Sequence, residues 1–482
     1  MKKINPLYKN RISLKVGPHD KKNSPVSVIF QKAAEHPQPG EPGKEVGDLF
    51  IERNVDKTVS VIISLGSKTK NGSDSYRKAG GSLGRWLVKN NVREANLNLA
   101  KSAPQDDLEM LVPLCEGVLL GAYQFLGYKS DLTPQPTLDF YISSNRHADM
   151  IEKIINKTEI LISSVNLARD WAHEPGNSIN PVTLAERVQT MAHQLNLKCI
   201  ILDETALQTM GAGAIVAVGK GSKTPSRLII VEYPGHNPQP DAKPVILIGK
   251  ALTMDTGGYS IKDRDNIQGM KYDKCGGMIV VASIHAAALL KIKTPVVGII
   301  PAAENMISDD AYRPDDIIKS LSGKTIEIVS TDAEGRLVLA DALTYAQRCY
   351  EPRSIIDMAT LTGGVVTALG RLRAGLMSNN HELTRQIVEA GEKTKELVWE
   401  LPLDDDYFQQ IKGDDADIKN SGGKEAHPII GGTFLKQFVD EKIPWAHIDI
   451  AGVADTPKET HYSPKGATGY GVRLMINYLE NL

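Results

Sequence analysis

Short apolar runs alternate with stretches of helical periodicity along most of this chain. In the first third, strand-like runs at 59–65, 96–99 and 137–142 are separated by stretches with helical spacing at 75–90 and 108–125. Such alternation is typical of an α/β fold in which most neighbouring strands are parallel. The pattern therefore predicts an N-terminal α/β module.

A second series of apolar runs occupies the C-terminal two thirds of the chain. The runs at 245–248, 296–300, 355–358 and 448–451 are short and largely apolar, and the stretch 276–290 has helical spacing with many small residues. Strands of this kind suit a sheet that helices bury on both faces. We therefore predict an α/β fold with a smaller N-terminal α/β domain and a larger C-terminal α/β domain, whose central sheet is mostly parallel or mixed.

The length of the chain also favours two domains. A chain of 482 residues is too long for one ordinary hydrophobic core. A stretch with helical periodicity at about 147–170 is followed by Glu-Pro-Gly-Asn at 174–177, which ends it. We predict an N-terminal domain at 1–160, with this stretch as a linker helix, and a C-terminal domain at 171–482.

The composition argues against several classes of function. The formal net charge is −2 and the charges are spread along the chain, so neither nucleic-acid binding nor binding to an anionic membrane is expected. The four cysteines are scattered without a CxxC pair, which argues against a zinc ribbon or disulfide framework and fits a reduced, cytoplasmic setting. Residues 1–9 lack the apolar core of a signal peptide, and no apolar run is long enough to predict a membrane span.

Charged residues concentrate in the stretch Ser-Thr-Asp-Ala-Glu-Gly-Arg at 330–336. It follows a strand-like run at 325–329 and leads into a stretch with strong helix formers. Asp332 and Glu334 are two positions apart, so both carboxylates can face one side of an extended backbone and hold a cation. The alternative is a simple turn at a strand end, with the aspartate capping the next helix.

A second group of charged residues follows the apolar run at 245–249. Lys250, Asp255 and Asp273 surround a Gly-rich turn there. Together with the two acids of the first stretch they would make four carboxylates and one amine. Carboxylates gathered in one pocket repel one another unless a cation neutralises them, and oxygen ligands of this kind suit Mg²⁺, Mn²⁺ or Zn²⁺. The residues therefore predict a metal site, and shared carboxylates suit two ions.

These two stretches resemble the corresponding motifs of the cytosolic leucine aminopeptidase family, the two-metal aminopeptidases. The resemblance is carried by the signature at 330–337 and the Gly-rich stretch at 249–258. It continues in shorter segments, at 166–170, 174–177, 304–306, 311–314 and 359–363. It is good from about residue 166 to the C-terminus and weaker before it.

The resemblance implies a metal-dependent aminopeptidase that releases N-terminal residues, leucine and other mainly apolar ones, from short peptides. It implies two divalent ions per subunit, Mn²⁺ or Zn²⁺. Asp255, Asp332 and Glu334 would hold one ion, and Lys250, Asp255, Asp273 and Glu334 the other. Ligation by a lysine requires the neutral amine, which a neighbouring dication favours. The residues alone favour an ion pair between Lys250 and a nearby aspartate.

The resemblance also implies two catalytic roles. Lys262 matches the family lysine that stabilises the oxygen of the gem-diolate, and its alternative is a solvated lysine in a loop. Arg336 matches the arginine that anchors a bicarbonate ion, which acts as general base in that family. The alternative for Arg336 is an ion pair with the acids of its own motif. His427 lies in a segment that departs from the family pattern, and we interpret it as a surface residue.

The side-chain pocket of the family maps onto five positions of this chain. They are Met270, Thr360, Leu361 (through its carbonyl group), Gly363 and Ala451. A methionine suits an adaptable apolar pocket, although plain core packing is its commoner role. Met254, Ile267 and Cys275 replace the residues usual in the family, so the preferred N-terminal residue stays open.

The resemblance further implies that the N-terminal domain serves assembly and that the subunits form a homohexamer acting on small peptides. Two other functions compete with this hypothesis. A two-metal phosphoesterase would also use paired carboxylates, but the chain has no P-loop and no His-rich metal motif. A DNA-binding or assembly protein that retains the site is the other alternative, and the balanced charge argues against it.

Overall fold

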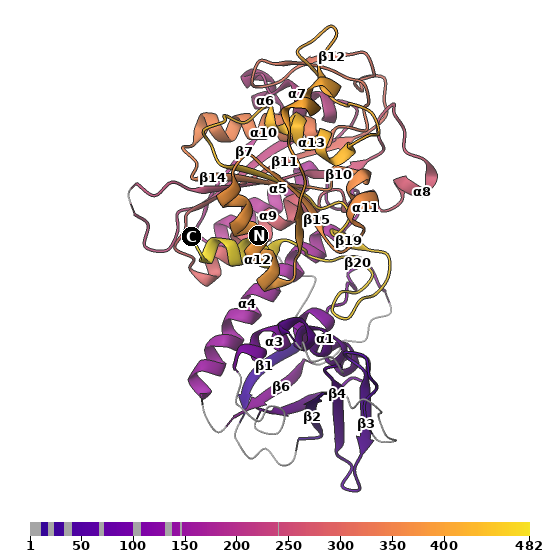
Figure 1. The fold of residues 1–482 in the computed structure, drawn as a ribbon, viewed down its shortest axis with the longest axis vertical. Coiled ribbons are helices and arrows are strands. Elements are labelled where there is room, and N and C mark those ends of the chain that lie inside the picture. The colour runs from indigo at the N-terminus through magenta and orange to yellow at the C-terminus, as the bar shows by residue number, and fades with distance from the viewer. Residues whose placement is uncertain are drawn as a thin grey trace. The chain divides into compact units, whose positions relative to one another are not determined.

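The computed structural model describes residues 11–17, 24–32, 41–66, 72–99, 108–130, 137–144, 147–239 and 241–482. The segment 1–9, for which no signal peptide is expected, lies outside these residues. The chain divides into two compact units. Unit 1 comprises Leu167–Asp455 and Ala467–Leu482, and unit 2 comprises the described residues before Leu167 together with Thr456–Gly466. The predicted α/β fold, with a smaller N-terminal and a larger C-terminal domain, is confirmed (Figure 1).

The main sheet of unit 1 has nine strands and is mixed. In pairing order, eight of them are β16 (Val398–Glu400), β15 (Ala374–Ser378), β18 (Trp445–Asp449), β14 (Ser354–Ala359), β9 (Val245–Gly249), β11 (Val296–Asn305), β8 (Arg227–Tyr233) and β7 (Lys198–Leu202). The ninth, β10 (Ala251–Asp255), pairs in parallel with the C-terminal half of β11. The central strands β18, β14, β9 and β11 are parallel, so their carboxyl ends meet at one edge of the sheet.

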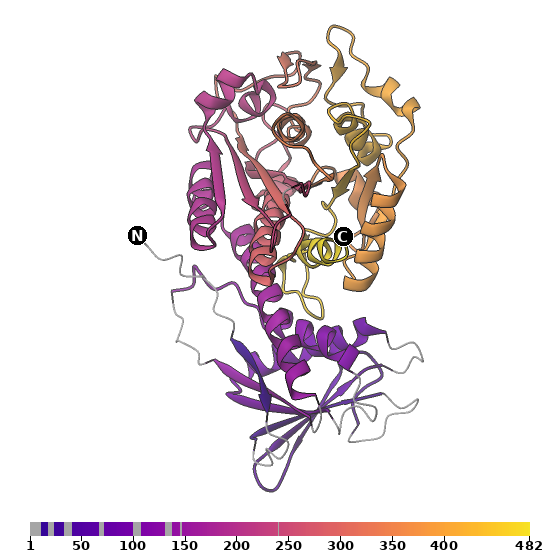
Figure 2. The same ribbon diagram turned by 90° about the vertical axis from the view of Figure 1, so that its left-hand side faces the viewer.

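Helices cover both faces of this sheet, as the view in Figure 2 shows. Val297 and Ile299 of β11 belong to the buried cluster that includes the apolar residues of α10 (Gly335–Cys349). Gly298 lies between them and faces Val280 and Ile284 of α9 (Cys275–Leu290). Since successive side chains of a strand point to opposite faces, α9 and α10 lie on opposite sides of the sheet.

The remaining helices of unit 1 are short or lie at its periphery. They are α5 (Pro181–Gln194), α6 (Glu204–Met210), α7 (Gly213–Gly219), α8 (Arg264–Ile267), η2 (Met270–Tyr272), α11 (Gly363–Leu369), α12 (His381–Thr394), η3 (Asp405–Ile411), α13 (His427–Lys436) and α14 (Val472–Glu480). Because α8, η2 and α11 follow strands of the main sheet, they lie in the loops that carry the polar residues discussed below.

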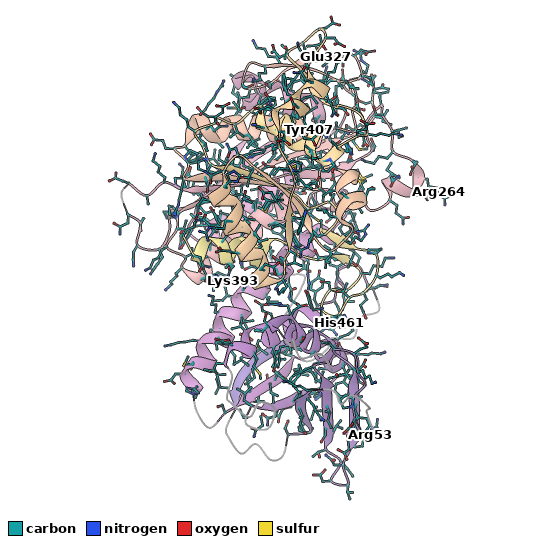
Figure 3. The ribbon with its side chains drawn as sticks, in the orientation of Figure 1. Arg53, Arg264, Glu327, Lys393, Tyr407 and His461 are labelled. Carbon is teal, nitrogen blue, oxygen red and sulfur yellow. The ribbon has the colours of Figure 1, made fainter. Side chains whose placement is uncertain are left out.

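A separate sheet of three short strands carries the approach to the charged motif. Its strands are β12 (Ile317–Lys319), β13 (Thr325–Glu327) and β17 (Ile418–Lys419), and Glu327 at the end of β13 is labelled in Figure 3. The strand expected at 325–329 therefore ends early. The reason is that the backbone N–H groups of Val329 and Ser330 donate to Oδ1 of Asn420, at 2.8 and 3.2 Å, and not to a neighbouring strand.

One described helical segment, Met270–Leu290, has the length and hydropathy of a membrane-spanning helix. The sequence pattern did not predict such a segment. The most apolar window of this segment has a mean hydropathy of 1.4, which is high enough for a membrane span, but 78% of that window is buried inside the protein. Helix α9 makes up most of it and packs on β9, β11 and β14, which is the position of a core helix.

Unit 2 contains a six-stranded sheet and two closely packed helices. In pairing order its strands are β1 (Ile12–Gly17), β6 (Leu138–Ser143), β5 (Glu94–Asn98), β2 (Val26–Gln31), β4 (Val59–Ser64) and β3 (Leu49–Arg53), of which only β3 is antiparallel to its neighbour. Helix α1 (Ser73–Lys89) packs on α3 (Leu111–Gly121), which follows the one-turn helix η1 (Leu108–Met110). A Cβ atom at Gly84 would overlap the carbonyl group of Val118, so this packing requires glycine.

Two features connect unit 2 to the rest of the chain. The long helix α4 (Ala148–His173) contains the division between the units, after Asn166. The segment Thr456–Gly466, flanked by the two-residue strands β19 (Asp455–Thr456) and β20 (Gly466–Ala467), groups with unit 2. Within unit 2, Arg85 of α1 forms an ion pair of 2.8 Å with Glu459 and donates to the carbonyl of His461, which Figure 3 labels.

Candidate functional site

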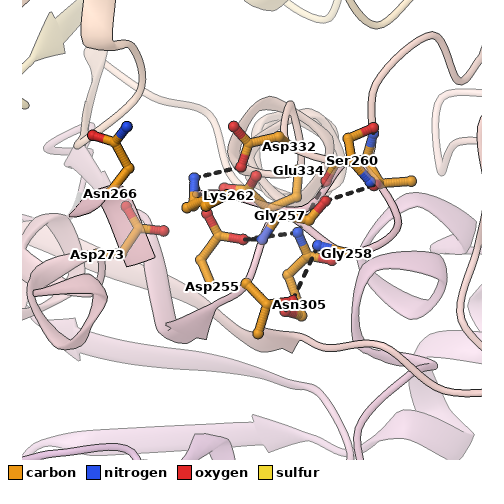
Figure 4. Close-up of polar contacts among 12 residues, drawn as sticks. Asp255, Gly257, Gly258, Ser260, Lys262, Asn266, Asp273, Asn305, Asp332 and Glu334 are labelled. Atoms are coloured by element: carbon orange, nitrogen blue, oxygen red, sulfur yellow. Dashed lines mark hydrogen bonds and ion pairs between the residues drawn. The ribbon is translucent and has the colours of Figure 1, made fainter. Parts of the chain in front are cut away.

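Three buried carboxylates converge where chain segments leave the main sheet of unit 1. Asp255 is the last residue of β10, Asp273 follows η2, and Glu334 immediately precedes α10. Each offers one oxygen, and these three oxygens lie within 4.8 Å of one another (Figure 4). As expected from the sequence, the fold therefore brings acids from distant segments of the chain together.

The prediction that Asp332 and Glu334 lie on an extended backbone is wrong. Glu334 has helical backbone angles (φ −74°, ψ −36°) as the residue before α10, so the two acids do not share an extended strand. Glu334 is 2% exposed, whereas the side chain of Asp332 is 39% exposed at the rim. The start of α10 thus carries Glu334 as a buried side chain, whereas Asp332 stays partly exposed to solvent.

Lys250 lies between two of the acids. Its Nζ is 2.8 Å from Oε1 of Glu334 and 2.9 Å from Oδ2 of Asp273, and it donates to the carbonyl of Thr360 at 2.9 Å. Burial lowers the pKa of Lys250, but the surrounding negative charge outweighs burial and holds it above its usual value. A Cβ at Gly335 would lie 2.7 Å from this Nζ, so the glycine of the motif makes room for the lysine.

Lys262 joins the buried acids to the exposed one. Its Nζ forms an ion pair of 2.7 Å with Oδ2 of Asp255 and contacts Oδ1 of Asp332. Burial lowers the pKa of Lys262, and the four acids raise it above its usual value overall. The side chain is 15% exposed, so Lys262 is mostly buried against the acids and is not a solvated loop lysine.

Burial and neighbouring negative charge disfavour the ionised forms of Glu334 and Asp273. Burial, followed by the charge of Asp255, raises the pKa of Glu334 to about 8. Burial raises the pKa of Asp273 to about 6, although Lys250 opposes this shift. Without a further cation, the fold therefore favours a proton on one of these carboxyl groups at neutral pH.

Unpartnered oxygens in the same cluster fit divalent cations. Oε2 of Glu334 is buried and accepts no hydrogen bond, and Oδ2 of Asp273 accepts none of good geometry although Lys250 is 2.9 Å away. Buried polar atoms are rarely left without a partner unless a ligand supplies one. Clustered oxygen ligands with one amine suit Mn²⁺ or Zn²⁺. The donor set therefore fits metal ions.

Residues without an assigned role in the sequence reasoning hold this cluster in place. Asn305, at the end of β11, donates from Nδ2 to Oδ1 of Asp255 at 2.8 Å and to the carbonyl of Thr331 at 2.9 Å. Tyr312 donates to the same carbonyl at 2.7 Å. Both residues lie in segments that carry the family resemblance. A polar residue directly after a long buried strand was the available signal for Asn305.

Arg336 is 2% exposed and lies beside the cluster at the start of α10. Nη1 donates to the carbonyl of Asn420 at 2.8 Å, whereas Nε has no partner. Burial lowers the pKa of Arg336 to about 10, against the charges of Glu334 and Asp449. Among the described residues no acid forms an ion pair with Arg336, so the alternative of pairing within its own motif is wrong. A buried guanidinium with a free donor fits a small anion.

The structure ties the predicted pocket residues Thr360, Leu361 and Ala451 to two buried aspartates, Asp273 and Asp449. Thr360 donates from Oγ1 to Oδ1 of Asp273 at 2.6 Å, and Met270, in η2, is partly buried. The backbone N–H groups of Leu361 and Ala451 both donate to Oδ1 of Asp449, at 3.1 and 3.2 Å. Asp449 is fully buried at the end of β18 and was missed by the sequence reasoning. It ties together two loops that carry predicted pocket residues.

Gly363 begins α11, and its neighbour Gly364 approaches α13. A Cβ at Gly364 would lie 2.7 Å from Cβ of His427. His427 is consequently partly buried, which differs from the surface position expected for it. Burial, followed by the positive charge of Arg336, lowers the pKa of His427.

Known proteins resemble this chain over most of its length. A family model described as "Cytosol aminopeptidase family, catalytic domain" matches residues 166–476, and one described as "Cytosol aminopeptidase family, N-terminal domain" matches residues 45–132. The chain is 43% identical over 446 residues to the "Probable cytosol aminopeptidase" of Syntrophotalea carbinolica, covering 91% of this chain and 89% of that protein. For the protein of the same description from Aquifex aeolicus, identity is 42% over 422 residues, with 87% and 84% covered.

A solved structure is also similar. It is that of the bottromycin maturation enzyme BotP in complex with Mn, which superposes with a TM-score of 0.85 at 28% sequence identity. The similarity covers 95% of this chain and 99% of that one. Both units of the chain therefore have counterparts in one known protein.

Proposed function

Because this chain belongs to the cytosol aminopeptidase family, we propose that it is a two-metal aminopeptidase that releases leucine and other mainly apolar N-terminal residues from short peptides. Membership makes the chain an aminopeptidase and a hydrolase. The metal, the preferred residue and the roles of individual side chains are the proposed part.

The observation that carries this proposal is the excess of buried acid in the cluster. Four carboxylates face two ammonium groups, which leaves a formal excess of two negative charges when all six groups are ionised. Two divalent cations would remove the repulsion that raises the pKa of Glu334 and Asp273. We assign one ion to Asp255, Asp332 and Glu334. We assign the other to Lys250, Asp255, Asp273 and Glu334.

The residues of the chain have distinct tasks in this proposal. When bound, the ions polarise the scissile carbonyl group and lower the pKa of water. The raised pKa of Lys262 keeps its ammonium group charged between Asp255 and the partly exposed Asp332. We assign to this group the stabilisation of the negative oxygen that develops during attack on the carbonyl. Thr360 and Asn305 orient Asp273 and Asp255 through the hydrogen bonds described above.

Arg336 has a separate role. Its unpartnered Nε and its burial support binding of a bicarbonate ion, which would accept the proton of the attacking water. This role suits the surroundings because neither charged motif contains a histidine, and His427, outside the motifs, packs on Gly364. Bicarbonate would thus supply a base that the side chains lack.

The pocket residues support cleavage of one residue at a time. We propose that the free α-amino group lies at the acids and the N-terminal side chain lies beside Met270, Thr360, Leu361, Gly363 and Ala451. Met270 provides an apolar and adaptable surface for that side chain. A peptide whose amino group is acetylated would lose the basic lone pair on which this placement depends.

The assembly and the location of the protein are also proposals. We propose a homohexamer in the cytoplasm, with small peptides as substrates and with neither nucleic acid nor membrane as a partner. Relatives named cytosol aminopeptidases support this location. Light scattering of the purified protein tests the assembly, and an active monomer at assay concentration would overturn it.

The proposed activity is tested by four assays in parallel. Leucine amide, N-acetyl-leucine amide, glutamate amide and a nitrophenyl phosphodiester are incubated with the full chain, with Mn²⁺ or with a chelator. We expect hydrolysis of leucine amide with Mn²⁺ only, slower hydrolysis of glutamate amide, and none of the other two. Hydrolysis of the phosphodiester without hydrolysis of leucine amide would instead support the phosphoesterase.

A further inference from the structure

A third buried lysine lies beside the candidate metal site. Lys274 directly follows Asp273 and is 0% exposed. Its ammonium group donates to three backbone carbonyl oxygens, of Glu174 at 2.7 Å, Ala172 at 3.1 Å and Lys271 at 2.5 Å. A lysine ammonium has three N–H donors, so these carbonyls satisfy it completely.

Lys274 differs from the other two buried lysines in its partners. Lys250 and Lys262 both form ion pairs with carboxylates, whereas no carboxylate in the described part of the chain forms an ion pair with Lys274. Burying a charge without a counter-charge is costly, so the three carbonyl contacts have to stabilise the buried ammonium group. The position of those carbonyls indicates what they are needed for.

The carbonyls come from two segments that are far apart in sequence. Ala172 is in the last turn of α4, where backbone carbonyls have no partner within the helix, and Glu174 begins the following turn. Lys271 belongs to η2, which immediately precedes Asp273. The ammonium group therefore caps the end of α4 and binds it to the turn that presents Asp273.

The turn after α4 also contacts the strand that carries the other key acid. A Cβ at Gly176 would lie 3.2 Å from the carbonyl of Thr253 and 3.5 Å from Cβ of Met254, both in β10. Asp255 is the last residue of that strand. A continuous set of contacts thus runs from Asp273, through Lys274 and the turn, to the strand of Asp255.

We propose that Lys274 is a positioning residue, a covalently tethered cation whose carbonyl cradle sets the spacing between Asp273 and Asp255. The metal-binding consequence rests on the proposed function, whereas the cradle itself does not. The cradle should then accept a small free cation in place of the side chain, since carbonyl oxygens can replace the hydration shell of such an ion.

Two variants of the full chain distinguish this role from ordinary packing. Lys274→Ala removes the cation and leaves space for a small ammonium ion, while Lys274→Met removes the cation and fills the space. Mn²⁺ affinity is measured by calorimetry and thermal unfolding by fluorescence, each with methylammonium, tetramethylammonium or sodium chloride at equal ionic strength. Lys319→Ala, at an exposed position, controls for the loss of one positive charge.

We expect Lys274→Ala to bind one of the two Mn²⁺ ions roughly 10–100-fold more weakly than the parent chain, the usual effect of losing a residue that orients a metal ligand. We also expect its unfolding temperature to fall by several degrees. Methylammonium should restore the Mn²⁺ affinity and the unfolding temperature of Lys274→Ala, but should restore neither quantity in Lys274→Met. Tetramethylammonium is too large for the cradle and should restore neither quantity in either variant. Lys319→Ala should behave as the parent chain.

Three results would overturn or separate the claims. Parent-like Mn²⁺ affinity in Lys274→Ala would contradict the role of Lys274 in positioning Asp273. If methylammonium restores neither the Mn²⁺ affinity nor the unfolding temperature of Lys274→Ala, the claim that the side chain acts as a tethered cation is wrong. If Lys274→Ala does not fold, Lys274→Gln takes its place, and parent-like affinity in that variant counts against the proposal. If the parent chain binds no Mn²⁺, the proposed function fails, and recovery of thermal stability by methylammonium alone decides the role of the cradle.

Discussion

Each unit of this protein buries a cluster of charged side chains, and the two clusters differ in balance. In unit 2, Arg77 of α1 forms an ion pair of 2.7 Å with Glu116 of α3 and another of 3.3 Å with Asp74, which also pairs with Lys78 at 2.9 Å, so two cations face two acids. Both Arg77 and Glu116 are at most 5% exposed. In unit 1, two lysines share four acids, and oxygens of Glu334 and Asp273 lack good hydrogen bonds.

The difference indicates what each cluster is for. A matched buried pair is satisfied within the fold, and removing one partner leaves an unpaired charge. An unmatched cluster with raised carboxyl pKa values is costly to the fold, which is typical of a functional site. The comparison therefore predicts opposite responses to mutation in the two units.

The largest effect is expected for the acid at the centre of the unmatched cluster. Glu334→Ala should abolish hydrolysis of leucine amide and lower the Mn²⁺ content of the protein, because Glu334 is assigned to both ions. The metal-free Glu334→Gln protein should be at least as stable as the metal-free parent, since burial and the charge of Asp255 raise the pKa of Glu334 and so disfavour its ionised form. Full activity with two bound ions in Glu334→Ala would contradict the assignment.

The matched pair should respond in stability and not in metal binding. Glu116→Ala leaves Arg77 buried without its closest partner, so unfolding of the chain in urea should show a loss of about 3–5 kcal/mol, the range for breaking a buried pair. Mn²⁺ content per folded chain should equal that of the parent. A loss of metal without a loss of stability would show that the two clusters are not separate in function.

A third prediction separates charge stabilisation from metal ligation within the unmatched cluster. Lys262→Ala should lower kcat by about 10²–10³-fold with little change in KM, the scale for losing one donor to an oxyanion. Its Mn²⁺ content, measured by atomic absorption, should match that of the parent. If the variant loses an ion instead, Lys262 supports metal binding and not the oxyanion.

The smallest effect is expected for the arginine at the edge of the cluster. Arg336→Ala should retain both ions and fold normally, and its rate should no longer rise when bicarbonate is added. The expected loss is the bicarbonate-dependent part of the rate only, because the acids and Lys262 are unchanged. A bicarbonate response equal to that of the parent would remove the anion-binding role from Arg336.

The sequence predicted the buried strands well where they were uniformly apolar. The run 245–248 is β9, and the helix expected at 276–290 is α9. Of the run expected at 448–451, only Ile448 and Asp449 belong to β18, which begins at Trp445 and ends at Asp449. The polar residues Trp445 and His447 obscured the pattern, because their Nε1 and Nδ1 atoms are buried against Asp357 on the neighbouring strand, at 2.7 and 2.5 Å. Such pairing across strands cannot be predicted from local periodicity.

The site was predictable in its residue types more than in its geometry. Lys250 and Asp255 were expected in a Gly-rich turn, whereas Ala251–Asp255 is a strand that pairs with β11. The strands β1, β2 and β3 were not predicted at all. Contacts over long sequence distances, such as that of Asn305 with Asp255, depend on the register of β10 against β11. The family resemblance supplied the grouping of the acids that periodicity could not.

The central claim is that the unmatched cluster of unit 1 holds two divalent ions. Anomalous diffraction from crystals soaked in Mn²⁺ tests it most directly. We predict two peaks about 3.5–4 Å apart, the usual spacing of a two-metal site, with Asp332 beside one and Lys250 and Asp273 beside the other. A map without peaks at these residues, from crystals of protein that hydrolyses leucine amide, would contradict the account.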